Sequence, residues 1–78
     1  MKLYTKDICP KCMLVKFSLE NAGVLDKVEI INLDEHPEVR EELKTNEKSK
    51  NYTSLPILEK DGEFIVDQAQ IISTVVNG

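Results

Sequence analysis

The order of strand-like and helix-like segments in the first 33 residues constrains the fold more than any other feature. Lys2–Thr5 is short and rich in strand-preferring residues, and residues 28–33 form a β-branched run of the same type. Between them, a helical pattern begins at Pro10, whose missing N–H costs nothing in a first turn, and ends at Gly23, a natural helix stop. A strand–helix–strand crossover is almost always right-handed, so we expect the two strands to lie parallel in one sheet.

Apolar residues at helical spacing indicate which face of each early helix is buried. In the first helix, the predicted apolar face consists of Met13, Leu14, Phe17 and Ala22. A second helix is predicted over residues 38–50, because acidic residues come early in that segment and lysines come late. Only Val39 and Leu43 mark its inner face, so we expect a surface helix that frays within residues 45–53.

The second half of the chain predicts an antiparallel hairpin followed by a third helix. Two strand patterns, residues 57–60 and 63–66, flank Asp61-Gly62, a dipeptide that suits a tight hairpin turn. Asp67 is a predicted helix N-cap, with Gln70 placed as in a capping box. The apolar positions of this helix are Ala69, Ile72 and Val76. The resulting order is βαβαββα, an α/β class, and we expect residues 1–78 to form a single domain.

Composition limits the classes of function. Apolar residues make up 41% of the chain and charged residues 31%, which is the balance of a globular protein. The net charge of −4 gives no electrostatic reason to bind phosphate backbones, so no nucleic-acid partner is expected. Residues 1–7 lack the apolar stretch of a signal peptide, and no apolar run reaches transmembrane length. We therefore expect a cytoplasmic protein that does not associate with membranes.

The two cysteines form a close pair, Cys9-Pro10-Lys11-Cys12, at the predicted junction of strand and helix. Their spacing lets a disulfide close without unfolding the chain. Cys9 would sit at the helix N-terminus, where unpaired N–H groups and the helix dipole lower the pKa of its thiol. Cys12, inside the first turn and less exposed, would attack the mixed disulfide that Cys9 forms with a substrate. The pair therefore predicts a reversible redox disulfide with Cys9 as nucleophile.

Two further features shape the predicted site. The charges of Lys6 and Lys11 would add to the helix dipole and favour the Cys9 thiolate. An X–Pro bond can be cis at modest cost, and a cis Leu55–Pro56 bond would turn the backbone of Leu55 outward to pair with an extended substrate. From the residues alone, the lysines could also be ordinary surface charges, and Pro56 could simply be the first residue of a strand.

A close cysteine pair can also bind metal, because two thiolates supply half of a tetrahedral zinc site. The single histidine, His36, lies in an acidic loop and is expected to face solvent near a helix start. We therefore predict no metal site, and a non-catalytic metal- or cluster-binding module is the remaining alternative. In that alternative, a Cys12→Ser variant would keep its function.

With these residues identified, the chain resembles the dithiol glutaredoxins and glutaredoxin-like redoxins over essentially its full length. Residues 4–12 are similar to the family's strand, lysine and CPxC segment, and Ser54-Leu55-Pro56 takes the place of its Thr-Val-Pro. The resemblance implies a thioredoxin-like fold with a four-stranded mixed sheet flanked by three helices. It also implies that Cys9 is the nucleophile, that Pro56 is cis and that Lys6 lines a glutathione or substrate groove.

The resemblance further implies a thiol–disulfide oxidoreductase, an electron carrier for protein disulfides or glutathione mixed disulfides, with glutathione as co-substrate and no bound cofactor. Asp67 and Gln68 fall where glutathione-binding members hold the γ-glutamyl end of the tripeptide. The implied substrate- or glutathione-binding residues are Lys6, Lys11, Leu55, Pro56, Asp67 and Gln68. Some redoxins of this size are instead reduced by thioredoxin reductase and donate electrons to ribonucleotide reductase, which is the alternative function here. We expect a monomer.

Overall fold

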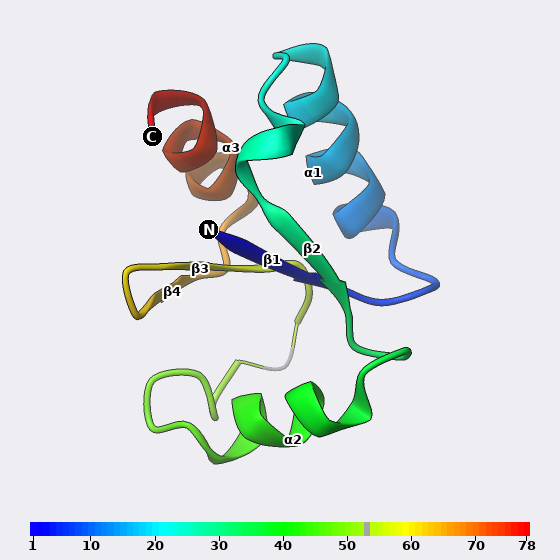
Figure 1. The fold of residues 1–78 in the computed structure, drawn as a ribbon, viewed down its shortest axis with the longest axis vertical. Helices are drawn as coiled ribbons and strands as arrows, with labels where there is room; N and C mark the ends of the chain where they lie inside the picture. Colours follow the sequence, from blue (N-terminus) through cyan, green and yellow to red (C-terminus); the bar gives the residue numbers. More distant parts are fainter. Residues whose placement is uncertain (53) are drawn as a thin grey trace.

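Strand β1 (Lys2–Thr5) lies inside a four-stranded sheet and pairs along both of its edges in the computed structural model (Figure 1). The structure describes residues 1–52 and 54–78. The other strands are β2 (Glu29–Asn32), β3 (Ile57–Lys60) and β4 (Glu63–Ile65), and the order is β2-β1-β3-β4. β1 is parallel to β2, whereas β3 is antiparallel to both β1 and β4. The parallel crossover and the four-stranded mixed sheet are thus confirmed.

Three α-helices cover the two faces of this sheet. They are α1 (Pro10–Asn21), α2 (Pro37–Thr45) and α3 (Gln68–Asn77), and a short 3₁₀ turn, η1 (Leu25–Lys27), precedes β2. α1 and α3 lie side by side on one face, and α2 lies alone on the other (Figure 1). Within the described residues, none of these helices has the length and apolar character needed to cross a membrane.

The elements are slightly shorter than the sequence predicts. The second helix ends at Thr45 rather than at residue 50, where its predicted range ended, because Asn46 adopts an extended conformation with ψ of 127°. Residue 53, the end of the predicted fraying segment, lies outside the described residues. The strands predicted over 28–33 and 63–66 are each trimmed by a residue at one or both ends.

Alternate residues of β1 and β3 point to opposite faces of the sheet, which produces two apolar layers. Leu3 and Leu58 face α1 and α3. The buried apolar layer on this side of the sheet consists of Leu3, Val15, Leu19, Val28, Leu58, Ile71 and Val75. Tyr4 and Ile57 face α2 and pack with Leu33. Val39 and Leu43 of α2 pack against this second layer, so the inner face predicted for that helix is confirmed.

The buried face of α1 differs from the predicted one. Cys12, Val15 and Leu19 are buried, whereas the predicted core residues lie on the solvent side: Met13, Leu14, Phe17 and Ala22. The prediction was wrong because apolar residues occur around most of this helix, so their spacing does not select one face. The burial of Cys12 does select it, since positions three and seven residues later share its face.

The buried face of α3 is also displaced from the prediction. Ile71 and Val75 are fully buried, Ile72 is half-buried, and the predicted core positions Ala69 and Val76 are exposed. Apolar residues come in adjacent pairs along this helix, so either register satisfies helical spacing. Packing against α1 and the sheet selects the register that ends at Val75.

The predicted turns and caps are confirmed. Gly23 follows α1 in the left-handed region, at a φ of 72°, and its N–H and that of the next residue close a Schellman motif. Asp61 and Gly62 both have positive φ, 53° and 81°, as a tight hairpin turn between right-twisted strands requires. The Asp67 carboxylate accepts the backbone N–H of Gln70 at 3.0 Å and so caps α3.

Candidate active site

Cys9 lies between strand β1, which ends at Thr5, and helix α1, which begins at Pro10. It is the N-cap of α1, with an extended backbone (φ −151°, ψ 93°), and Pro10 occupies the first helical position. Its Sγ accepts the backbone N–H of Cys12 at 3.1 Å, the role that a serine or aspartate oxygen plays in most caps. The sulfur is therefore held against the positive end of the helix dipole.

Cys9 and Cys12 are joined in a disulfide, and their Cα atoms lie 5.2 Å apart. Both residues are buried, and the exposed fraction is 4% for Cys9 and 1% for Cys12. Cys9 alone of the pair lines a surface groove. An incoming reagent in that groove reaches the Cys9 sulfur first.

This groove, which we call the Cys9 groove, has a volume of about 330 Å³. Its lining residues come from the β1–α1 junction and from the segment before β3, and they are Lys6, Ile8, Cys9, Pro10, Lys11, Ser54 and Leu55. The predicted residues Lys6, Lys11 and Leu55 are thus brought together around the sulfur. Both lysines are exposed, and the ion pairs among the described residues involve neither of them.

The Leu55–Pro56 peptide bond is cis, as the resemblance implied. The carbonyl oxygen of Leu55 lies 3.7 Å from the Cys9 Sγ. Because a disulfide sulfur has no proton, this is a van der Waals contact in the oxidised protein, and a reduced thiol there would have an acceptor beside it. The Pro56 ring is buried, and the Leu55 side chain packs on the apolar layer beneath the sheet.

Three of the predicted residues do not line the Cys9 groove: Pro56, Asp67 and Gln68. Asp67 uses its carboxylate to cap α3, and Gln68 is the first residue of that helix. Three groove residues were not among the predicted site residues: Ile8, Pro10 and Ser54. The available signal was adjacency, since each directly precedes a residue that was identified.

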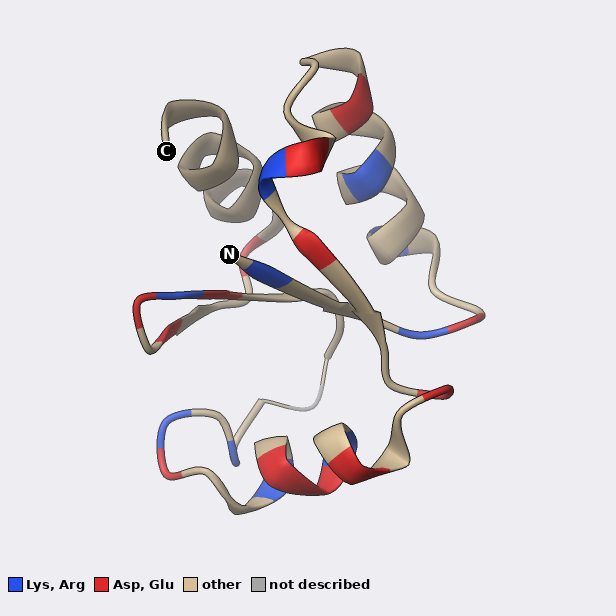
Figure 2. Ribbon diagram, viewed as in Figure 1, with Lys and Arg blue, Asp and Glu red and all other residues tan. Residues whose placement is uncertain are grey.

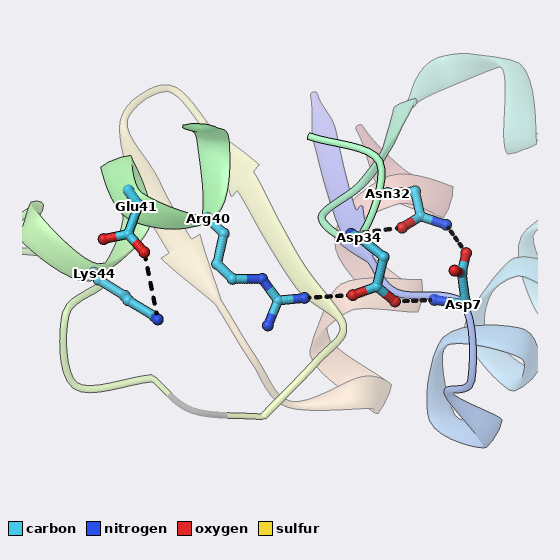
Figure 3. Close-up of polar contacts among 6 residues, drawn as sticks. All are labelled: Asp7, Asn32, Asp34, Arg40, Glu41 and Lys44. Atoms are coloured by element: carbon cyan, nitrogen blue, oxygen red, sulfur yellow. Dashed lines mark hydrogen bonds and ion pairs between the residues drawn. The ribbon is translucent and has the colours of Figure 1, made fainter. Parts of the chain in front are cut away.

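A polar network attaches the loop before Cys9 to the end of β2 (Figure 3). The Asp34 carboxylate accepts the backbone N–H of Asp7 at 2.9 Å, and the Asn32 amide donates to the Asp7 carboxylate at 2.6 Å. Arg40 of α2 pairs with the other oxygen of Asp34 at 2.8 Å. The loop that carries Lys6 and Ile8 is therefore anchored at its middle residue.

Charge is distributed unevenly over the elements around this site. Acidic and basic residues are mixed along α2 and the loop after it, whereas α3 carries no charged residue (Figure 2). His36 is the N-cap of α2 and its side chain is 51% exposed, as expected. Within residues 1–52 and 54–78, no group of three or more His, Cys, Asp or Glu is placed to hold a metal ion.

Comparison with known families identifies the family to which the chain belongs. The family model described as Glutaredoxin matches residues 1–65, a span that contains both cysteines, the whole sheet and the cis Leu55–Pro56 bond. A search of curated proteins found no matching relative.

Proposed function

Because the chain belongs to the glutaredoxin family, we propose that it is a thiol–disulfide oxidoreductase that reduces protein disulfides or glutathione mixed disulfides through Cys9 and Cys12. One observation carries the proposal. The Cys9 sulfur lies at the N-terminus of α1, accepts the N–H of Cys12 and lines a groove, while Cys12 lies behind it. This arrangement favours a thiolate at the reachable sulfur and a second thiol within bonding distance.

The reaction proceeds in two displacements. The Cys9 thiolate attacks one sulfur of the partner disulfide, forms a mixed disulfide and releases the other partner sulfur as a thiolate, which takes up a proton. Cys12 loses its proton and attacks the Cys9 Sγ, which closes the Cys9–Cys12 disulfide and releases the second partner thiol. Two electrons and two protons pass to the partner, and the product is the oxidised form seen in the structure.

Glutathione is the proposed co-substrate, and no bound cofactor is needed. One glutathione thiolate attacks Cys9 and frees Cys12, and a second attacks the glutathione sulfur of that mixed disulfide, which yields oxidised glutathione and the dithiol. Lys6 and Lys11 offer positive charge to the glutathione carboxylates in the groove, which Leu55 also lines. Asp67 and Gln68 do not line the Cys9 groove, so any contact they make with glutathione lies outside it.

Thioredoxin reductase is the alternative reductant, with ribonucleotide reductase as acceptor. Pro56, Asp67 and Gln68 do not line the Cys9 groove, so only three of the six proposed glutathione contacts gather beside the sulfur, which supports this alternative. We also propose a cytoplasmic location, since a reducing compartment keeps such a dithiol available.

The test supplies the oxidised protein with either glutathione and glutathione reductase or thioredoxin reductase, and follows NADPH consumption. The acceptor is the mixed disulfide of glutathione and mercaptoethanol. Faster turnover with glutathione supports the proposal, and faster turnover with thioredoxin reductase favours the alternative. Cys9→Ser abolishes turnover in either case. Given a protein disulfide, Cys12→Ser accumulates a mixed disulfide with that protein. A variant that still binds the partner protein but traps no mixed disulfide would indicate a binding module.

A further inference from the structure

The outer face of α1 carries an apolar surface that the core does not use. We call it the α1 patch, and it consists of Ile8, Pro10, Met13, Leu14 and Phe17. Ile8 is 85% exposed, and Met13, Leu14 and Phe17 are 61–65% exposed. Pro10, Met13, Leu14 and Phe17 line a shallow hollow of about 360 Å³. Scattered exposed apolar residues are normal, but a contiguous set of this kind marks a binding surface.

The α1 patch is continuous with the Cys9 groove. Ile8 and Pro10 line that groove together with the reactive sulfur, and Pro10 also lines the hollow farther along the helix. A molecule that brings a sulfur to Cys9 therefore already covers one end of the patch. Whether that molecule also covers Leu14 and Phe17 depends on its length.

The length of the patch distinguishes a small thiol from a protein. Phe17 lies eight residues beyond Cys9, which at 1.5 Å per residue is about 12 Å along the helix axis. Glutathione has one residue on either side of its cysteine, and even its longer γ-glutamyl arm spans only roughly 7 Å, so glutathione bound at Cys9 does not reach Phe17. A protein surface flanking a disulfide is large enough to cover the whole patch.

The charges beside the patch indicate the chemistry of that surface. At about 3.6 residues per turn, Lys11 and Lys16 fall on opposite sides of the apolar stripe, and Lys6 stands beside its Ile8 end. Ion pairs among the described residues include none of these three lysines. The nearby acidic residues are Glu20, one turn beyond Phe17, and Asp7, whose carboxylate accepts from Asn32. Three lysines against these two acids leave a local positive excess on a chain whose net charge is −4. A complementary partner presents an apolar centre with an acidic rim.

We propose that the α1 patch binds the redox partner, a protein that presents an apolar, acid-rimmed surface next to the disulfide that Cys9 attacks. This proposal rests on the proposed function and names the substrate class of the same site. The patch supplies affinity for the protein surface, and the Cys9 groove supplies the chemistry. Preference for a protein over a small disulfide then comes from side chains that never touch the reacting sulfur atoms.

The test compares two synthetic peptides, each with its cysteine in a mixed disulfide with thionitrobenzoate. One carries Leu and Phe among Glu residues, in arms of about four residues that span roughly 13 Å when extended. The other carries Ser in the same places. The tested variant combines Leu14→Gln with Phe17→Gln, and the control is Val76→Gln, an exposed valine on α3.

The wild type and the control are expected to reduce the apolar peptide about tenfold faster than the serine peptide, a factor that corresponds to about 1.4 kcal/mol. The double variant loses this preference but reduces the mixed disulfide of glutathione and mercaptoethanol at the wild-type rate. If the wild type reduces that small disulfide without preferring the apolar peptide, the docking inference is wrong and the proposed function stands. If it reduces neither, the proposed function itself is wrong. A dimer in sedimentation that the double variant abolishes would assign the patch to a second copy and overturn the inference.

Discussion

The Asp34 carboxylate holds the backbone N–H of Asp7 at 2.9 Å, so a residue after β2 fixes the loop that leads into the reactive cysteine. Asp34→Ala removes the acceptor and leaves that N–H to water. We expect the free energy of unfolding to fall by about 0.5–1.5 kcal/mol and the Asp7 amide to exchange hydrogen faster. Glu41→Ala is the control, because it breaks only the exposed Glu41–Lys44 pair of 3.6 Å in the same region (Figure 3). Equal exchange rates in both variants would show that Asp34 does not hold the loop.

The charge of Lys11 should govern the reactivity of Cys9 in the reduced protein. Lys11→Glu replaces a positive charge in the Cys9 groove by a negative one, which disfavours the thiolate. We expect alkylation by iodoacetamide at neutral pH to slow roughly fivefold, as about 1 kcal/mol of surface charge interaction implies. Lys27→Glu makes the same charge reversal beyond the far end of α1 and serves as control. A pH profile of alkylation that is identical in the two variants would remove Lys11 from the mechanism.

The two faces of α1 should respond very differently to truncation. Leu19→Ala removes a fully buried side chain and is expected to lower the free energy of unfolding by about 2–5 kcal/mol. Phe17→Ala removes a larger side chain that is 63% exposed, and its effect should stay within about 0.5 kcal/mol. Urea denaturation of both variants measures the difference. A large loss of unfolding free energy in Phe17→Ala would show that the outer face of α1 is packed against the rest of the protein.

The Tyr4 hydroxyl should make the fold sensitive to alkaline pH. Two effects raise the pKa of Tyr4 from 10.0 to about 12: the larger is burial of the hydroxyl, and the next is the negative charge of Glu59. The folded protein thus favours the neutral phenol, so this contribution to stability is complete below about pH 10 and is lost as the pH rises toward 12. Tyr4→Phe cannot ionise and should lose less stability than the wild type between about pH 8 and about pH 11. Urea denaturation midpoints at both pH values test this, with Tyr52→Phe as the exposed control. Equal losses of stability in the wild type and in Tyr4→Phe would contradict the prediction.

Local sequence signals predicted most of the fold because each rests on a short-range rule. Gly23 can adopt positive φ, Asp61-Gly62 fits one turn geometry, and Asp67 caps the helix that follows it. The same holds for the site, since Cys9 and Cys12 need only a helix start and the right spacing. These outcomes depend on neighbours in the chain and can be derived without the rest of the molecule.

Features that depend on distant packing could not be derived in this way. The apolar spacing of α1 does not choose between its faces, and contact with the sheet and α3 buries Val15 and Leu19 while Leu14 and Phe17 stay outside. The membership of Ser54 in the Cys9 groove likewise depends on how the segment before β3 approaches the β1–α1 loop. That approach is a tertiary property with no local sequence pattern.

Helix α3 lies beyond the residues matched by the family model, which end at 65, yet Ile71 and Val75 complete the layer against which α1 packs. A fragment cut at that boundary would leave Val15 and Leu19 facing water on one side. The helix that presents Cys9 would then lose its lateral support while every residue named in the disulfide chemistry was still present. For expression or domain grafting, the working unit therefore extends through the C-terminal helix, whatever boundary a sequence comparison draws.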